Sequence, residues 1–153
     1  MANDTRVAIV MGSTSDEGHL EPAFKLLDLF GLGWEKQILS AHRQPDELRR
    51  YIEDADSRGV AVFIAAAGLA AALPGVVAAH TLKPVIGIPV PGGPLKGIDA
   101  LLSIVQMPGG IPVATVGVGS NGPKNAAVLA ARILSLTDES VGKKLQEHRD
   151  SMR

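Results

Sequence analysis

The sequence predicts an α/β protein built on a doubly wound parallel sheet, and two observations support this. Short apolar runs alternate along the chain with segments of helical periodicity. Several of these runs are apolar at every position rather than at every second one, which is typical of parallel strands buried on both faces. We therefore predict a three-layer α/β/α domain with a flavodoxin-like sheet.

Five strands are expected, separated by helices. The apolar runs that predict strands cover residues 7–11, 34–39, 60–65, 85–88 and 113–118. Apolar residues at helical spacing follow the first two strands, over residues 20–30 and 48–55. These segments give the alternation βαβαβ expected of a parallel sheet.

Boundary residues agree with this order of elements. Pro45 suits the first turn of a helix, and Gly31 and Gly59 suit helix C-termini. A helix is expected to begin near residues 121–125. A last amphipathic helix over residues 138–152 places Val141, Leu145 and Met152 on one side.

Length and composition favour one domain that spans residues 1–153, with a core over about 6–136 and the C-terminal helix over about 138–152. A net charge of -1 and few aromatic residues argue against a nucleic-acid partner. The chain has no cysteine, which excludes disulfides and thiolate metal sites, and its N-terminus lacks the pattern of a signal peptide. We expect a cytoplasmic protein.

One uncharged stretch, residues 60–79, is long enough to suggest a membrane span. Residues 60–64 instead predict a buried strand, Pro74-Gly75 breaks the segment, and alanine takes the place of the leucine and isoleucine that favour insertion. We therefore expect no membrane contact. The small side chains predict a helix buried in the core or at a subunit contact.

The loop after the first strand, Gly12-Ser13-Thr14-Ser15-Asp16, suits a ribose phosphate. It lies where ligands bind in doubly wound folds, and the N–H groups and dipole of the following helix can hold a phosphate. This loop reads as neither Gly-x-Gly-x-x-Gly nor Gly-Lys-Ser/Thr. Asp16 would repel a phosphate but accepts hydrogen bonds from sugar hydroxyls. The alternative is that Ser15 or Asp16 only caps the helix.

The loop after the second strand, Ser40-Ala41-His42-Arg43, is expected at the same sheet edge and next to the first loop. Arg43 can bind phosphate oxygens in a bidentate manner, and His42 can both donate and accept a proton near neutral pH. A purely structural role is the alternative for His42.

Other candidates carry weaker signals. His19 and His148 are expected on solvent-facing helix surfaces, and His80 at the end of a helix. No histidine or carboxylate spacing predicts a metal site. The loop over residues 92–97 follows the fourth strand and is either a mobile rim of the pocket or a plain turn.

Three separated motifs, at residues 12–16, 40–45 and 102–115, together resemble a known family. Over about residues 6–136 the chain resembles the bacterial class I N5-carboxyaminoimidazole ribonucleotide mutases of purine biosynthesis. The resemblance implies an isomerase that works without metal, ATP or organic cofactor. Such an enzyme moves a carboxylate from the exocyclic nitrogen of the imidazole ribonucleotide to C4 of its ring.

The resemblance also implies the site residues and the assembly. His42 would be the proton shuttle. The residues expected to bind the ribonucleotide are Ser13, Ser15, Asp16, Ser40, Ala41, Arg43 and Gly68. Of these, Ser13, Ser15 and Arg43 would hold the 5′-phosphate, and Asp16 would hold the ribose hydroxyls. Residues 40–41 would contact the base, and Gly68 would line the pocket for the transferred carboxylate. The assembly would be a homo-octamer built around the alanine-rich helix.

The sequence departs from the family pattern Gly-Ala-Gly-Gly-Ala-Ala-His-Leu-Pro-Gly at Ala72, where the family has histidine. Leu69 replaces a glycine, and Gly93 replaces a small polar residue. His42 would then be the only imidazole in the pocket. Two alternatives stay open: a class II-type carboxylase that adds CO2 directly to aminoimidazole ribonucleotide, and a catalytically impaired ribonucleotide-binding oligomer. Arg43, where class II carries lysine, favours the mutase.

Overall fold

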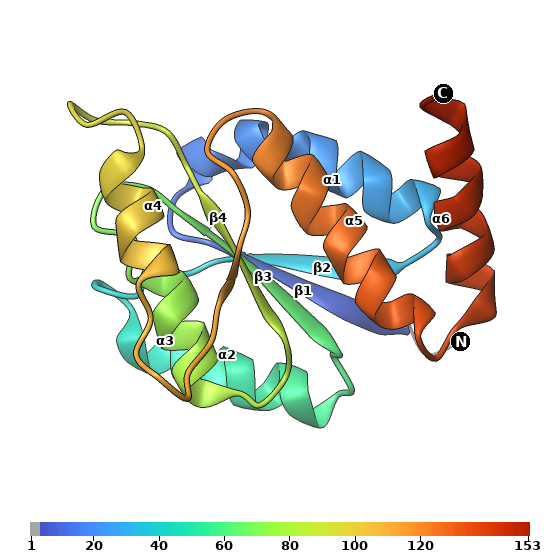
Figure 1. Cartoon of the computed structure of the whole chain (residues 1–153). Helices are drawn as coiled ribbons and strands as arrows, with labels where there is room; N and C mark the ends of the chain where they lie inside the picture. Colours follow the sequence, from blue (N-terminus) through green and yellow to red (C-terminus); the bar gives the residue numbers. More distant parts are fainter. Residues whose placement is uncertain (1–3) are drawn as a thin grey trace.

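A computed structural model describes residues 4–153 and contains one parallel sheet (Figure 1). Its strands are β1 Thr5–Met11, β2 Gly33–Ile38, β3 Val62–Ala67, β4 Val85–Pro89 and β5 Ala114–Thr115. They pair in the order β2-β1-β3-β4-β5, with every pair parallel. The predicted flavodoxin-like fold class is confirmed. From β1, the chain adds β2 on one side of the sheet and then β3 and β4 on the other side. Ligands bind in the crevice at the point where the strand order reverses in this way.

Helices cover both faces of the sheet (Figure 1). One face carries α1 Glu17–Leu29 and α5 Asn121–Ser135, which pack side by side, and α6 Glu139–Ser151 packs on α5. The other face carries α2 Pro45–Ser57 and α3 Leu73–His80, while α4 Ile98–Val105 packs on β4 and β5. A short 3-10 turn, η1 Thr14–Asp16, precedes α1. These layers hold the carboxyl ends of the strands at one edge.

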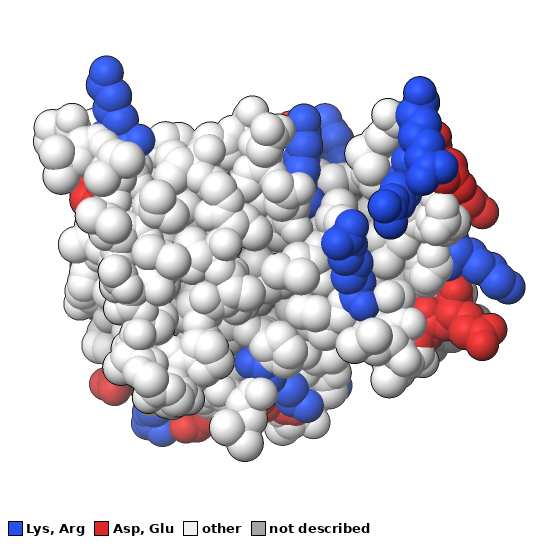
Figure 2. Space-filling view, viewed as in Figure 1, with Lys and Arg blue, Asp and Glu red and all other residues white. Residues whose placement is uncertain are grey.

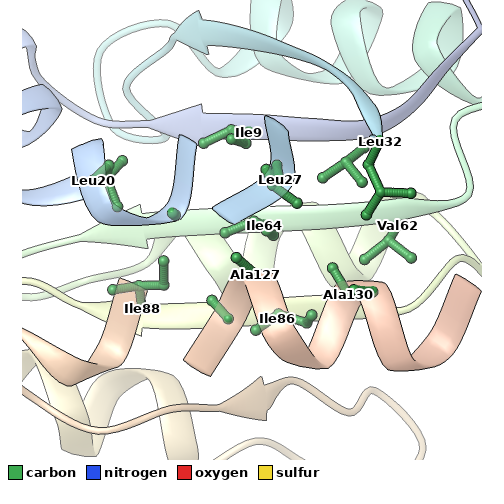
Figure 3. Close-up of a cluster of buried hydrophobic side chains, with 14 of the residues drawn as sticks. Ile9, Leu20, Leu27, Leu32, Val62, Ile64, Ile86, Ile88, Ala127 and Ala130 are labelled. Atoms are coloured by element: carbon green, nitrogen blue, oxygen red, sulfur yellow. The ribbon is translucent and has the colours of Figure 1, made fainter. Parts of the chain in front are cut away.

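The core consists of two apolar clusters, one on each face of the sheet. Under α1 and α5, isoleucines of three neighbouring strands meet the helices, as Figure 3 shows for Ile9, Ile64 and Ile86. On the opposite face, Phe63 packs with residues of α2, α3 and α4. Successive side chains of a strand point to opposite faces, so the central strands must be apolar throughout to fill both clusters.

Two edge strands differ from the prediction. β2 pairs only with β1 and carries Glu35, Lys36 and Gln37, so it is not apolar on both faces. β5 covers residues 114–115 instead of 113–118, although the amide of Val116 still donates to the carbonyl of Gly87 at 3.1 Å. Gly119 then adopts a left-handed φ of 93° and turns the chain away from the sheet.

The alanine-rich stretch is not one helix. It divides into the end of β3 at Ala67, a loop over residues 68–72 and α3 from Leu73. The third strand therefore begins and ends two residues later than predicted. In the part of the chain that the structure describes, no helix combines the length and apolar character needed to cross a membrane.

The C-terminal helix α6 forms as predicted, and its cap is well defined. The carboxylate of Asp138 accepts hydrogen bonds from the amides of Ser140 and Val141 at 3.0 and 3.4 Å, and from Arg6 at 2.6 Å. Val141 is buried against the core, whereas Met152, which follows the last residue of the helix, is exposed. His148 was expected on a solvent face, but it packs edge-on against the buried Phe30 with ring centroids 5.5 Å apart.

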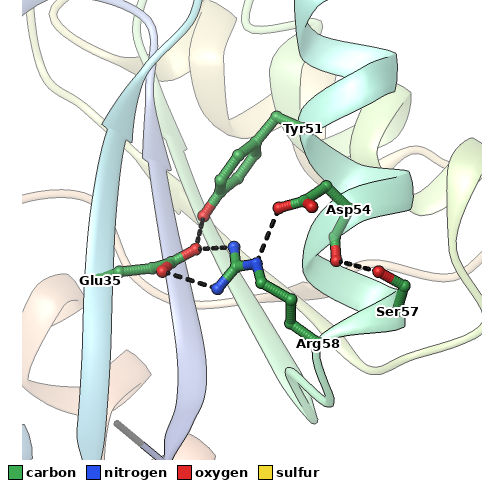
Figure 4. Close-up of polar contacts among 5 residues, drawn as sticks. All are labelled: Glu35, Tyr51, Asp54, Ser57 and Arg58. Carbon is green, nitrogen blue, oxygen red and sulfur yellow. Dashed lines mark hydrogen bonds and ion pairs between the residues drawn. The ribbon is translucent and has the colours of Figure 1, made fainter. Parts of the chain in front are cut away.

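A polar cluster ties the C-terminal end of α2 to β2 (Figure 4). The guanidinium of Arg58 donates to both carboxylate oxygens of Glu35, at 2.6 and 3.0 Å, and to Asp54 at 2.7 Å. The Tyr51 hydroxyl donates to Glu35 at 2.7 Å. The hydrogen bonds from Arg58 hold the pKa of the Glu35 carboxyl below its usual value.

Candidate functional site

A cleft of about 810 Å³ opens at the carboxyl ends of the first four strands. Four loops line it, and each follows one strand of the sheet. The lining residues lie at 12–19, 40–43, 67–73 and 90–93. Because the strands are parallel, their carboxyl ends meet at one edge, and loops far apart in the sequence become neighbours.

The loop after β1 forms a single polar turn at the start of α1. The Ser13 hydroxyl accepts hydrogen bonds from the amide of Ser15 at 3.3 Å and from its hydroxyl at 2.9 Å. The amide of Asp16 donates to the carbonyl of Ser13 at 3.1 Å. The capping predicted as an alternative therefore does occur, with Ser13 as the cap of η1 rather than Ser15 or Asp16. Both hydroxyls still line the cleft.

The loop after β2 is a tight turn held by hydrogen bonds to Ser40. The hydroxyl of Ser40 accepts from the amide of Arg43 at 3.3 Å, and its carbonyl accepts from the amide of Gln44 at 2.9 Å. Within residues 4–153, the side chains of His42 and Arg43 are held by no hydrogen bond or ion pair, and both are exposed at the cleft. They are therefore available to a ligand.

The loops after β3 and β4 give the cleft an uncharged side. Residues 67–73 and 90–93 contribute only alanine, glycine, leucine, valine and proline. The amide of Val90 donates to the carbonyl of Ala67 at 2.9 Å, so β3 and β4 still pair where these loops begin. The cleft thus has a polar half on β1 and β2 and an apolar half on β3 and β4.

His19 corrects one prediction. It was expected on a solvent face, but it is half-buried in the first turn of α1 and lines the cleft. Its Nε2 is buried, and nothing in the described part of the chain hydrogen-bonds it. His42 is therefore not the only imidazole lining the cleft. The spacing of three residues from Asp16 is the signal that could have found His19, because it places both residues on one helix face.

Burial and mutual charge affect Asp16 and His19 in opposite directions. Burial raises the pKa of the Asp16 carboxyl, although a hydrogen bond with the Ser13 backbone and the charge of His19 oppose this. Burial lowers the pKa of the His19 imidazole, and the Asp16 charge opposes that shift. The two groups form one electrostatic pair on the β1 side of the cleft.

The structure brings every predicted site residue to this one cleft. The lining includes Ser13, Ser15, Asp16, Ser40, Ala41, His42, Arg43 and Gly68. Ala72, at the position of the family histidine, lies there as well. Among residues 4–153, no group of three or more histidine and carboxylate side chains is arranged to hold a metal ion.

Comparisons with known proteins agree with the sequence motifs. Residues 6–153 match the sequence model of the family described as AIR carboxylase. The N5-carboxyaminoimidazole ribonucleotide mutase of Bacillus subtilis is 52% identical over 147 residues, 96% of this chain and 91% of that protein. The Escherichia coli K12 protein of the same name is 47% identical over 96% of this chain and 87% of its own length. A crystal structure of Treponema denticola PurE matches with a TM-score of 0.86 and 34% identity, covering 95% of this chain and 89% of that one.

Proposed function

Since the chain belongs to the AIR carboxylase family, we propose that it is an N5-carboxyaminoimidazole ribonucleotide mutase, with His42 as its proton shuttle. The enzyme is an isomerase of purine biosynthesis. The observation that carries this proposal is the meeting of Ser13, Asp16, His42 and Arg43 at one cleft. A phosphate, a ribose and a proton-transfer centre each find a matching group there.

The polar half of the cleft holds the ribonucleotide. Arg43 and the hydroxyls of Ser13 and Ser15 bind the 5′-phosphate at the start of α1, where the helix dipole also favours an anion. The Asp16 carboxylate accepts hydrogen bonds from the ribose hydroxyls. Residues 40–41 contact the base, so the imidazole ring of the substrate lies beside the side chain of His42.

The reaction conserves protons and needs no ATP, metal or organic cofactor. Protonated His42 donates to the exocyclic nitrogen as its bond to the carboxylate breaks, and the electron pair of that bond stays on the nitrogen. CO2 is released and is attacked by the electron-rich C4 of the ring, which forms the new C–C bond. Neutral His42 then removes the proton from C4 and restores the aromatic ring.

The uncharged half of the cleft serves the intermediate. CO2 must be recaptured before it escapes or is hydrated, so the reacting end of the cleft has to exclude water. The small apolar residues of the β3 and β4 loops, Gly68 among them, form a wall that offers water no hydrogen-bonding side chain. This is the part of the cleft that we assign to the carboxylate.

Neither alternative function is favoured. The curated relatives are named mutases, and Arg43 stands where a class II carboxylase is expected to carry lysine. Ala72, where the family resemblance implies a histidine, is the one feature that would favour an impaired binding protein. His19 supplies an imidazole to the same cleft from α1, so the chain does not lack a second one there.

An assay of the purified protein with the carbamate substrate tests the proposed function. Without ATP, the N5-carboxylated ribonucleotide should disappear while the C4 acid appears in equal amount. Formation of the C4 acid only from aminoimidazole ribonucleotide and bicarbonate would indicate the carboxylase instead. Tight binding without turnover would indicate the binding protein, and either result would overturn the mutase.

We further propose that the protein works as a homo-oligomer, the octamer that the family resemblance implies. One face of α4 supports this, because Ile98, Leu102 and Val105 follow at helical spacing and are 56%, 53% and 46% exposed. Figure 2 shows that the side of the molecule carrying α4 and α3 has few charged side chains, in contrast to the region around α6. Sedimentation should give eight times the 15.9 kDa chain mass.

The proposed pathway also implies a cytoplasmic location, which cell fractionation of the source organism would test.

A further inference from the structure

Leu69 adopts a backbone conformation that its side chain disfavours. Its φ is 54°, in the left-handed region that bulky residues rarely enter, and its side chain is 56% exposed at the cleft. Such an outlier is kept only where the surrounding structure imposes it, and these residues gather at functional sites.

Leu69 reaches across to the neighbouring loop and rests on Gly93. A Cβ atom built on Gly93 would lie 2.5 Å from Cδ2 of Leu69, which is closer than two carbon atoms approach in proteins. Gly93 itself has a φ of 63°. No side chain fits at residue 93 while Leu69 keeps this position. Gly92, the adjacent residue, has open space where its Cβ would stand.

A second contact lies beside the first. A Cβ built on Gly68 would stand 3.3 Å from the carbonyl oxygen of Val90, so these two backbones also approach closely. The loops after β3 and β4 therefore approach closely at two places, Gly68 with Val90 and Leu69 with Gly93. Leu69 and Gly93 both line the cleft, and they do so on the other side of β1 from His42.

We propose that Leu69 and Gly93 form one sterically coupled unit, here called the Leu69–Gly93 seal, which closes the uncharged side of the cleft and retains CO2 during the reaction. The role in CO2 retention rests on the proposed function. The steric coupling does not. On this account residues 69 and 93 depend on each other, because the isobutyl group of Leu69, in the position it holds here, occupies the space that a side chain at residue 93 would need.

A double-mutant cycle in urea unfolding tests the coupling. Gly93→Ala should destabilise through both its left-handed φ and the clash with Leu69. Leu69→Ala removes the clashing atoms, so the double variant should unfold with an equilibrium constant about tenfold smaller than the product of the single effects predicts. Gly92→Ala is the matched control and should be additive with Leu69→Ala. Additivity at residues 69 and 93 would overturn the seal.

Amide hydrogen exchange tests the closure without using turnover. Leu69→Ala should speed exchange of the amides in residues 92–97 and leave those of residues 13–16 unchanged, because only the first segment adjoins the seal. Gly92→Ala should leave the exchange of segment 13–16 and of the α4 amides unchanged. If Leu69→Ala leaves the exchange of residues 92–97 as in the unmodified protein, Leu69 does not close the cleft.

The products of the carbamate assay test the retention of CO2. Leu69→Ala should raise severalfold the ratio of free aminoimidazole ribonucleotide to C4 acid, with KM little changed because the phosphate side is untouched. Turnover with an unchanged ratio would overturn the role in retention while leaving the mutase intact. Absence of turnover in the unmodified protein would overturn the mutase and the retention together, and the unfolding cycle would still decide the coupling.

Discussion

His42 and Arg43 lie in a turn whose hydrogen bonds do not involve their side chains. The hydroxyl and carbonyl of Ser40 accept the backbone hydrogen bonds of this turn, so neither side chain is needed to hold its shape. Substitutions at these two positions should therefore report on ligand and chemistry rather than on folding.

Replacing His42 separates catalysis from binding. We expect His42→Asn to fold normally and to bind the ribonucleotide with nearly unchanged affinity. Its kcat should fall by about 100-fold or more, the typical cost of losing a general acid–base group. Steady-state assays and titration calorimetry measure the two quantities. His80→Asn, at the exposed end of α3, is the control, and an unchanged kcat in His42→Asn would refute the assignment.

Replacing Arg43 should have the opposite signature. Arg43→Ala removes a charge-assisted contact to phosphate, so binding of the ribonucleotide should weaken by about 1.5 to 3 kcal/mol. The bound complex should turn over with a smaller loss in kcat. Arg49→Ala, on the exposed face of α2, serves as the control for a lost positive charge. Equal affinity in the Arg43 variant and the unmodified protein would show that the phosphate lies elsewhere.

His19 should make stability depend on pH. Burial lowers its pKa from the usual 6.5, so the unfolded chain binds this proton more readily than the folded protein does. The free energy of unfolding should therefore fall as pH drops below about 6.5, the usual histidine pKa. Urea unfolding between about pH 5.5 and 7.5 should show a shallower slope for His19→Gln. Identical slopes for His19→Gln and the unmodified protein would contradict this account.

At the scale of the elements, helix α2 is held at both ends by different means. Its first turn follows the loop that carries His42, and Pro45 at its start fixes the backbone there. Its last turn is tied to β2 through Arg58 and Glu35 (Figure 4). The second attachment lies at the opposite end of the helix from the cleft.

Breaking this attachment should lower the free energy of unfolding and leave the catalytic rate unchanged. Arg58→Ala should lower the free energy of unfolding by about 1 kcal/mol at neutral pH, since the pair is partly exposed and screened by solvent. Glu35 has a lowered pKa, so its contribution is complete above about pH 4.5 and is lost as pH falls through the lower folded value. Urea unfolding at about pH 7 and 3 checks both points. A deficit of the same size at both pH values would contradict the ion-pair explanation.

Sequence patterns predicted the elements whose residues face only the core. The strands at residues 7–11 and 85–88 are apolar on both faces because two clusters enclose them, so their composition reveals them. β5 covers only two residues, and the pattern of apolar residues continues past the point where its pairing with β4 stops. The amino-acid composition of a strand does not show where its pairing with the neighbouring strand ends.

Site residues that lie close together in the sequence could be predicted. Residues that only the fold brings together could not. The two polar loops are contiguous motifs, so Asp16 and His42 could be identified from the sequence. His19 was placed on the solvent side because helical periodicity does not show that a cleft opens at the first turn of α1. The contact of Leu69 with Gly93 joins residues from two different loops, and no local pattern encodes it.

At the scale of the whole molecule, surface charge is distributed unevenly. Charged side chains gather around α6 and the lower edge, while the side with α4 and α3 is mostly uncharged (Figure 2). Large exposed apolar side chains such as Leu102 lie on that side. Monomeric proteins rarely expose large contiguous apolar surfaces, and we propose that the exposed apolar residues of α4 make subunit contacts.

A charge on this face should weaken the assembly. Leu102→Asp should shift the sedimentation coefficient towards smaller species and leave the far-ultraviolet circular dichroism of the chain unchanged, because the residue is exposed in the single chain. Leu136→Asp is the control, since this leucine is 84% exposed and lies at the far end of α5 from α4 (Figure 1). If both variants sediment like the unmodified protein, the α4 face is not an interface.

The division of the cleft into two halves also bears on how such an enzyme changes over time. The groups that we propose to bind the ribonucleotide come from the β1 and β2 loops, and the wall that we assign to the carboxylate comes from the β3 and β4 loops. The two halves share no residue, so the wall around the carboxylate can vary while His42 and the proposed ribonucleotide-binding residues stay the same. Chimaeras that exchange only residues 68–72 and 90–97 between homologues would follow the same route in the laboratory.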